Sequence, residues 1–166
     1  MKYSRGFTLV ETLVAIAILT IAISGPFVAA QRSFIAASIA RDQFIATFLA
    51  QEALEYIHAI RDDNYLAGRN WLSGLGACEG GNSCTVDPTQ EVISACNGIC
   101  GGLALSDTGL YNQTPVSSTN HATPFTRTVT IEQINPTEVR ITVSVSFNSG
   151  HASHTVSAKE SLFNWL

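Results

Sequence analysis

The sequence predicts an α+β protein in which one long N-terminal helix packs against a small antiparallel β-sheet. Two observations support this fold class. A long apolar run over residues 7–30 is followed by apolar side chains that recur at helical spacings from Ile35 to Ile60. Residues 125–166, in contrast, alternate apolar and polar side chains as half-buried strands do. A helix followed by consecutive strands is typical of α+β domains, because the apolar face of such a sheet needs a helix to cover it.

The N-terminal apolar stretch is long enough to cross a membrane. Between Phe7 and Ala30, Glu11 is the one ionisable side chain, and about 20 apolar residues span the hydrocarbon core of a bilayer as a helix. A charge at the membrane centre costs about 2.5–3.5 kcal/mol on insertion scales, so an isolated glutamate indicates a function that involves a charged partner. We therefore predict a membrane-spanning helix over residues 7–30.

A specific motif stands at the start of this helix. Residues 6–11 read Gly-Phe-Thr-Leu-Val-Glu and follow a short basic leader that contains Lys2 and Arg5. This arrangement resembles the N-terminal signature of type IV pilins and of the pseudopilins of type II secretion. The resemblance implies that a prepilin peptidase removes residues 1–6 as a leader peptide by cutting between Gly6 and Phe7, and then N-methylates Phe7.

The same resemblance implies a role for the isolated glutamate. In assembled filaments of this family, the N-terminal helices form the core, so residues 7–30 are expected to serve first as a membrane anchor and then as filament core. Glu11 would pair with the Phe7 ammonium of a neighbouring subunit and fix the axial register. An uncleaved single-pass anchor with an incidental Glu11 is the alternative interpretation.

The charges that flank the apolar stretch predict its orientation. By the positive-inside rule, Lys2 and Arg5 keep the leader in the cytoplasm, so the C-terminal part lies outside it. With this orientation, the resemblance implies that the protein crosses the inner membrane once and later enters a pilus or pseudopilus. An ordinary secretory signal fits less well, because it would place the cleavage site after the apolar region.

A second helical segment is predicted over residues 31–64, continuous with the first. Its apolar residues recur at spacings of three, four or seven and define one face: Ile35, Ile39, Ala46, Leu49, Ala53, Ile57 and Ile60. Pro26 lacks a backbone donor, so a bend or local opening is expected near it. The polar run before Gly68, together with that glycine, marks the expected end of the helix.

Residues 65–124 are predicted to be a loop region with short strands, rich in glycine and cysteine. It contains the four cysteines of the chain: Cys78, Cys84, Cys96 and Cys100. An even number of cysteines outside the cytoplasm favours two disulfides, and the short spacings favour Cys78 with Cys84 and Cys96 with Cys100. The other two connectivities stay open, as does a zinc site.

Residues 125–166 are predicted to form an antiparallel β-meander. One strand alternates clearly, with its apolar face formed by Val139, Ile141, Val143, Val145 and Phe147. Turn residues on both sides of it indicate flanking strands, the first of which carries Phe125, Val129 and Ile131. Leu162, Phe163 and Trp165 are expected to close the edge. The final Asn164-Trp165 pair resembles minor pilins and minor pseudopilins more than major pilins.

Composition and spacing argue against several other functions. The net charge of −4 becomes −6 once the two leader cations are lost, which argues against nucleic acid as a partner. No phosphate loop or nucleophile motif is present. His151 and His154 have no carboxylate or cysteine pattern around them, and the acidic loop residues lack the order of an EF-hand. We therefore predict no catalytic residue, no metal and no cofactor.

The predicted function is assembly rather than catalysis. The resemblance implies a minor pilin or pseudopilin that primes or tips a filament. Its expected partners are prepilin peptidase, other pilin or pseudopilin subunits, the inner-membrane assembly platform and membrane lipid. The alternative is a filament-displayed binding module whose cysteine-rich head recognises a surface, a secreted substrate or DNA, and an anchored enzyme is a third hypothesis.

Overall fold

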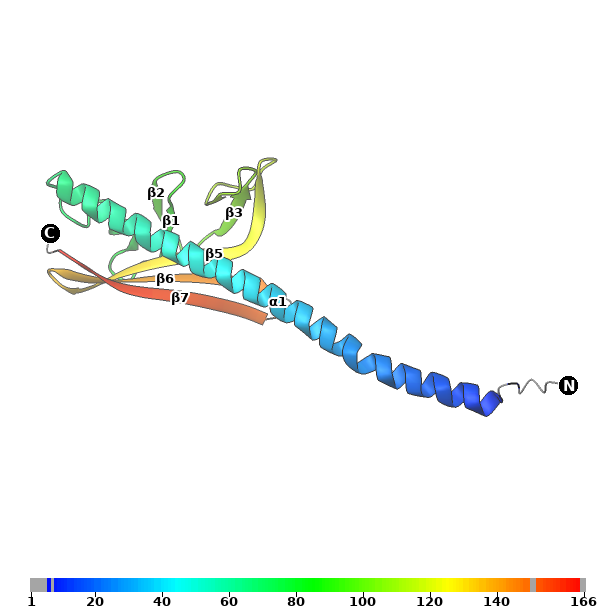
Figure 1. The fold of residues 1–166 in the computed structure, drawn as a ribbon. Coiled ribbons are helices and arrows are strands. Elements are labelled where there is room, and N and C mark those ends of the chain that lie inside the picture. The colour runs from blue at the N-terminus through cyan, green and yellow to red at the C-terminus, as the bar shows by residue number, and fades with distance from the viewer. Residues whose placement is uncertain (1–5, 7, 150–151, 165–166) are drawn as a thin grey trace. The chain divides into compact units, whose positions relative to one another are not determined.

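A computed structural model describes residue 6, residues 8–149 and residues 152–164. Within them the chain forms one long α-helix, one short 3-10 helix and seven β-strands (Figure 1). A single N-terminal helix followed by an antiparallel sheet is the α+β, pilin-like architecture that the sequence predicts. The chain divides into two compact units, Met1–Ala40 and Arg41–Leu166, which we describe separately.

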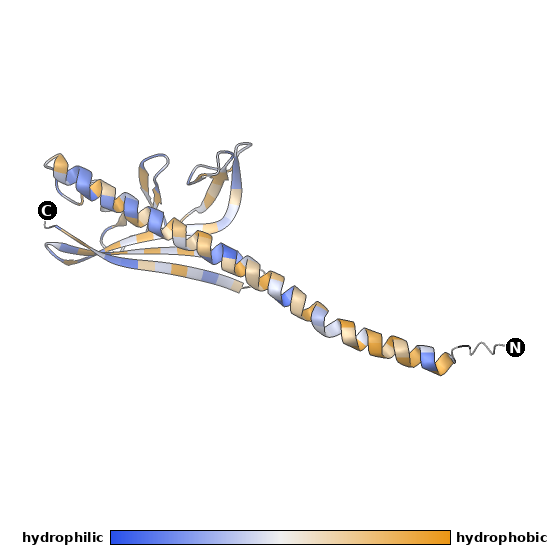
Figure 2. Ribbon diagram, viewed as in Figure 1, coloured by the Kyte–Doolittle hydropathy of each residue, from blue (hydrophilic) through white to orange (hydrophobic). Residues whose placement is uncertain are grey.

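The first unit is the N-terminal part of helix α1 (Leu9–Leu66), and its surface is apolar. Its most apolar window of 18 residues has a mean hydropathy of 2.3, with none of that window buried. Figure 2 shows these residues in orange. Of the helices described, α1 is long and apolar enough to cross a membrane. By length and composition, this unit therefore suits a lipid or protein environment better than water.

The helix continues through Pro26 without interruption. The local opening expected at this residue is therefore not found. Proline removes one backbone donor, but its fixed φ is itself helical, so the turns before and after it can keep their conformation.

The spacing of apolar residues predicts that Ile35 faces the core, but this residue is 62% exposed.

The C-terminal end of α1 is closed by a glycine. Gly68 has a φ of 65°, which suits glycine because it has no Cβ. The Arg69 N–H donates to the Asn64 carbonyl at 2.8 Å and the Gly68 N–H to the Tyr65 carbonyl at 3.0 Å. These two bonds form a Schellman motif, the usual way in which a glycine ends a helix. Gly68 thus ends the helix close to where its sequence position predicts.

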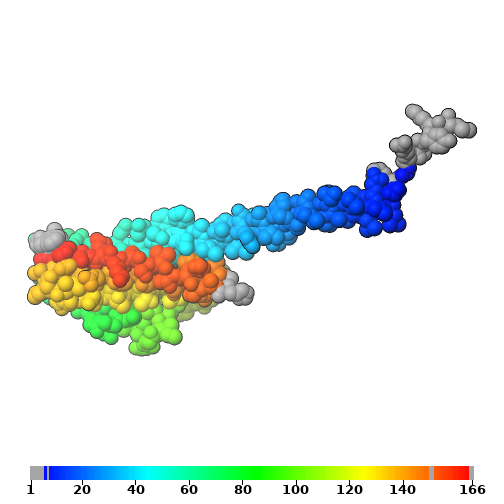
Figure 3. Space-filling model, turned by 90° about the horizontal axis from the view of Figure 1, so that it is seen from below, coloured from blue at the N-terminus to red at the C-terminus, as the bar shows by residue number. Residues whose placement is uncertain are grey.

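The second unit contains the rest of α1, the short 3-10 helix η1 (Gly76–Cys78) and a seven-stranded antiparallel sheet. The strands are β1 (Cys84–Asp87), β2 (Val92–Ala95), β3 (Gly102–Ser106), β4 (Tyr111–Asn112), β5 (Asn120–Asn135), β6 (Glu138–Ser149) and β7 (Ala152–Phe163). β5 pairs with β6 on one side and with β1 and β3 on the other, while β7 pairs with β6. The predicted meander is β5–β6–β7, whose strands lie side by side in Figure 3.

Strand β5 starts earlier than the sequence predicts. It begins at Asn120, inside residues 65–124, which the sequence predicts to be loops with short strands. The β3–β5 register shifts between the pair Gly102–Thr126 and the pair Ala104–Ala122, and Pro124 lies in that interval. A proline cannot donate to a ladder, so it is tolerated where the ladder is already irregular.

The core of the second unit lies between α1 and the sheet. The buried helix residues are Ala46, Leu49, Ala50, Ala53, Leu54 and Ile57. They meet the apolar face of the sheet, which includes the five alternating residues of β6 and Leu162 of β7. Trp71 and Leu75, from the connection after the helix, complete the cluster. Burial of this apolar surface is what stabilises the helix on the sheet.

Candidate functional site

The start of α1 carries the residues expected to act in processing and assembly. Gly6 is exposed, and a Cβ built on it would have no atom within 4 Å. Thr8 caps the helix, because its carbonyl accepts from the Thr12 N–H at 3.2 Å and its hydroxyl accepts from the Glu11 N–H at 3.3 Å. Phe7, the expected site of methylation, lies outside the described residues, as do Lys2 and Arg5 of the leader.

Glu11 lies in the first turn of α1 and is exposed. Its spacing from Thr8 is that of a capping box, and a carboxylate is favourable near the positive end of a helix dipole. Within residues 8–149 and 152–164, no basic side chain forms an ion pair with it. The helix therefore presents a carboxylate on an otherwise apolar surface, without a counterion from the described part of the same chain.

The other polar side chains of the apolar stretch satisfy themselves within the helix. The hydroxyls of Thr12, Thr20 and Ser24 donate to the carbonyls of the residues three positions earlier, at 2.8–2.9 Å. Such bonds remove the need for a partner in lipid. Sequence reasoning missed this distinction between the hydroxyls, which bond locally, and Glu11.

The N-terminal segment of the chain is similar to a known family motif. Residues 1–25 match the family model described as the prokaryotic N-terminal methylation motif. The chain has a prepilin-type N-terminus. This match supports a type IV pilin-like protein that is processed by prepilin peptidase and assembles with other pilins, a class that is structural rather than enzymatic. No curated protein and no solved structure matches the chain.

A buried arginine, which sequence reasoning missed, bonds the sheet of the pilin-like head to helix α1. Arg127 of β5 is fully buried and donates to the Leu49 carbonyl of α1 at 2.9 Å and to the Val86 carbonyl of β1 at 2.6 Å. It also pairs with the Glu52 carboxylate at 2.5 Å. The available signal was its position, since it lies between Phe125 and Val129 on the apolar side of the alternation.

A histidine beside a carboxylate and two tyrosines also lie at the contact between helix and sheet. His58 of α1 lies 3.2 Å from the Glu160 carboxylate of β7. Burial, together with the negative charges of Glu91 and Asp87, raises the pKa of Tyr56. Burial also raises the pKa of Tyr111, against the opposing effect of Arg41. Tyr111 packs edge-on against Phe125, with ring centroids 5.9 Å apart.

The four cysteines form two disulfides in the structure. Cys78 of η1 is bonded to Cys84 of β1, and Cys96 to Cys100 across a short loop, which is the pairing that the short spacings favour. With both bonds formed, no thiol is available for the alternative zinc site. The second bridge closes a loop that holds Ile99 at 91% exposure.

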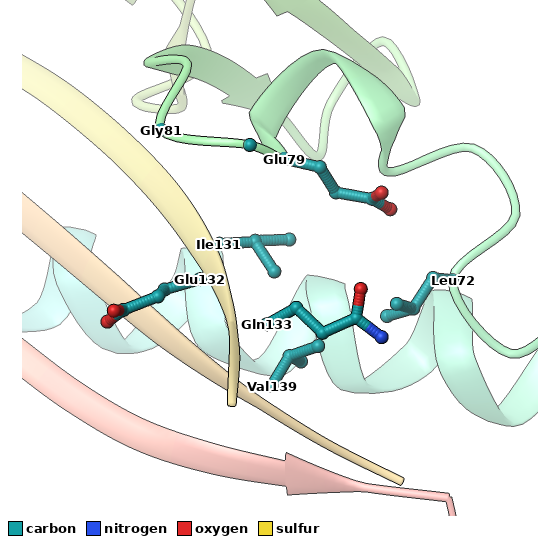
Figure 4. A pocket seen from close by; sticks show the side chains of 8 residues that line it. Leu72, Glu79, Gly81, Ile131, Glu132, Gln133 and Val139 are labelled. Carbon is teal, nitrogen blue, oxygen red and sulfur yellow. The ribbon is translucent and has the colours of Figure 1, made fainter. Parts of the chain in front are cut away.

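One hollow in the head is unlike an active site. It measures 490 Å³ and lies beside the end of β5 (Figure 4). Ile131, Val139 and Leu72 give it an apolar lining, and Glu79 and Gln133 lie at its polar side. Figure 4 shows Glu132 directed away from these side chains. One carboxylate beside an amide provides neither a nucleophile nor an acid–base pair.

The other residues considered for metal binding have structural roles or lie apart. Asp87 is buried, and its carboxylate accepts from the Gln113 N–H at 2.7 Å and from Thr89 and Gln90 in its own turn. His154 stacks on Phe147, with centroids 5.4 Å apart, and His151 lies outside the described residues. Over the described ranges, no three His, Cys, Asp or Glu side chains are grouped so as to hold a metal.

Proposed function

We propose that this chain is a non-enzymatic minor pilin or minor pseudopilin that primes or tips a type IV pilus or a type II secretion pseudopilus. The observation that carries the proposal is the prepilin motif of residues 1–25, joined to an exposed apolar helix and a folded head. The softer resemblance of the C-terminal strand and of Asn164-Trp165 to minor subunits favours a minor role over a major one.

Processing would come first. Prepilin peptidase would cut between Gly6 and Phe7 and methylate the new terminus, leaving the head outside the cytoplasm on a single membrane helix. A Cβ at Gly6 would lie more than 4 Å from every described atom, its two chain neighbours aside. Any requirement for glycine there would therefore arise in the peptidase rather than in the fold.

Assembly would follow through Glu11. A carboxylate and an ammonium are each costly in an apolar core, whereas together they form a desolvated pair whose geometry fixes register. The exposed apolar residues around Glu11 would pack against neighbouring helices and exclude water from that pair. The inner-membrane platform and the other subunits would supply the rest of the machinery.

Mass spectrometry of the protein from its native membrane tests the processing step. We expect a chain that starts at N-methylated Phe7, and a precursor that keeps its leader when Gly6 is replaced by leucine. Gly6→Leu should leave the stability of the head unchanged, because Gly6 belongs to the other compact unit. An intact Met1 terminus in cells with active prepilin peptidase would contradict the proposal.

A displayed binding module is the second candidate, and one observation favours it. The disulfide between Cys96 and Cys100 holds Ile99 almost fully exposed on a short closed loop, a form suited to insertion into an apolar pocket of a partner. Deletion of the gene separates the candidates. Loss of filaments supports the priming subunit, whereas filaments of normal yield that no longer bind their target support the binding module.

A further inference from the structure

The loop that joins β2 to β3 contains an asparagine followed by a glycine. Asn97 and Gly98 lie inside the ring that the disulfide between Cys96 and Cys100 closes, and both residues are exposed. No other asparagine of the chain precedes a glycine. The backbone nitrogen that follows an asparagine can attack its side-chain amide, and a glycine at that position hinders the attack least because it has no Cβ.

The Asn97 side chain is free to turn toward this nitrogen. It is exposed, and over residues 8–149 and 152–164 no group forms a hydrogen bond with its amide. Other asparagines are held in place or lack the attacking group. Asn64 and Asn112 are buried and bonded through their side chains, and Asn135 precedes a proline, which has no N–H to lose.

The attacking nitrogen belongs to a residue in an open position. Gly98 has a φ of 94°, and a Cβ built on it would lie more than 4 Å from every described atom, its two chain neighbours aside. Its N–H donates to the Cys96 carbonyl at 2.9 Å, which forms a three-residue γ-turn. A single bond on an exposed loop contributes little net free energy, so the need to break it slows the attack only roughly two- to tenfold.

We propose that Asn97 is a site of spontaneous deamidation. A base takes the proton from the Gly98 nitrogen, and this nitrogen attacks the Asn97 Cγ. A bond forms between these two atoms, the bond from Cγ to Nδ2 breaks, and Nδ2 leaves as ammonia after it takes up a proton from water. The product is a five-membered cyclic imide, whose formation needs no enzyme because the reacting groups belong to adjacent residues.

Water then opens the imide at one of its two carbonyls. Opening at Cγ gives aspartate in a normal main chain, whereas opening at the main-chain carbonyl gives isoaspartate, with the Cβ of residue 97 inserted in the main chain. Overall, one water is consumed and one ammonia is released. Both products add a negative charge, and isoaspartate also lengthens the closed ring that contains Ile99. The inference rests on this loop alone and holds whether or not the chain enters a filament.

Incubation of the full chain in detergent, in a mildly alkaline buffer, tests the proposal. Mass spectrometry of its peptides should find aspartate and isoaspartate at position 97, formed more slowly in mildly acidic buffer because the reaction needs a base. Asn82 is the internal comparison, since it is exposed but precedes Ser83. Asn97 should convert at least about tenfold faster than Asn82, which is a difference of about 1.4 kcal/mol in activation free energy.

Two variants complete the experiment. Asn97→Gln is the matched control, because its longer side chain would have to close a six-membered ring, and it should yield no acid at this position. Cys96→Ser with Cys100→Ser keeps the asparagine and the glycine but opens the ring. An Asn97 that stays intact in the wild type while it converts in this double variant would overturn the proposal, because the closed loop would then protect it. Equal rates of conversion at Asn97 and Asn82 would overturn it too.

Discussion

Glu11 and Arg127 are both charged residues in apolar sequence contexts, but the structure gives them opposite surroundings. Arg127 is enclosed by carbonyls and a carboxylate of its own chain. Glu11 is exposed on an apolar helix, and the described residues give it no counterion. Removing a partner from a charge buried within the fold destabilises that fold, whereas a charge left open in an apolar surface indicates assembly.

Glu11→Ala should be processed normally but enter filaments poorly. The junction at Gly6 is unchanged, whereas loss of one member of a buried pair costs about 3–5 kcal/mol, which lowers incorporation more than a hundredfold. Glu11→Asp should be intermediate, since it keeps the charge but shortens its reach. The assay is the ratio of tagged subunit in sheared filaments to that in membranes. Incorporation of Glu11→Ala at the wild-type level would rule out the pairing mechanism.

Arg127→Met should destabilise the head by about 3 kcal/mol. It removes three hydrogen bonds from the contact between helix and sheet, although Glu52 is 39% exposed and can be hydrated once its partner is lost. Arg140→Met is the matched control, because that arginine is 46% exposed and its surface pair with Glu132 contributes at most about 1 kcal/mol. Thermal unfolding followed by circular dichroism measures both, and equal losses would contradict the structural role of Arg127.

Among the elements, those with a strong local pattern could be predicted from sequence. The long helix, its end near Gly68 and strand β6 follow from periodicity and turn residues. Strands β1–β4 and the start of β5 could not be placed, because they depend on pairing between distant segments and on an irregular ladder around Pro124. The roles of Gly6, Phe7 and Glu11 are predictions that rest on the sequence alone, whereas the burial of Arg127 needed the register of β5 to show it.

The disulfide-linked elements should be oxidised in the exported protein. Non-reducing mass analysis should find Cys78 joined to Cys84 and Cys96 to Cys100, with no free thiol. Cys96→Ser with Cys100→Ser should lower the stability of the head by about 2 kcal/mol, because the loop it frees is short. Alkylation of all four thiols without reductant, together with bound zinc, would instead support the metal site.

At the scale of the whole head, stability should fall in alkaline solution. The pKa values of Tyr56 and Tyr111 are raised in the folded state, so above about pH 10 the unfolded chain releases these protons first and becomes relatively more stable. Below that pH both states keep the protons, so these tyrosines do not change the free energy of unfolding with pH.

Urea unfolding between about pH 9 and pH 11 measures this effect. The double variant Tyr56→Phe, Tyr111→Phe should lose less stability over that range than the wild type. If the free energy of unfolding of the double variant falls with pH as steeply as that of the wild type, other groups cause the loss of stability in alkaline solution.

The buried guanidinium also determines how the head responds to mechanical load. A force applied along α1 reaches the sheet through contacts that cross the helix axis, so the bonds from Arg127 to Leu49 and Glu52 are loaded in shear together with the apolar core. Bonds loaded side by side share the force, whereas bonds loaded one after another break in turn. Because Arg127 also donates to the Val86 carbonyl, the load spreads from the part of α1 that packs on the sheet to two strands at once.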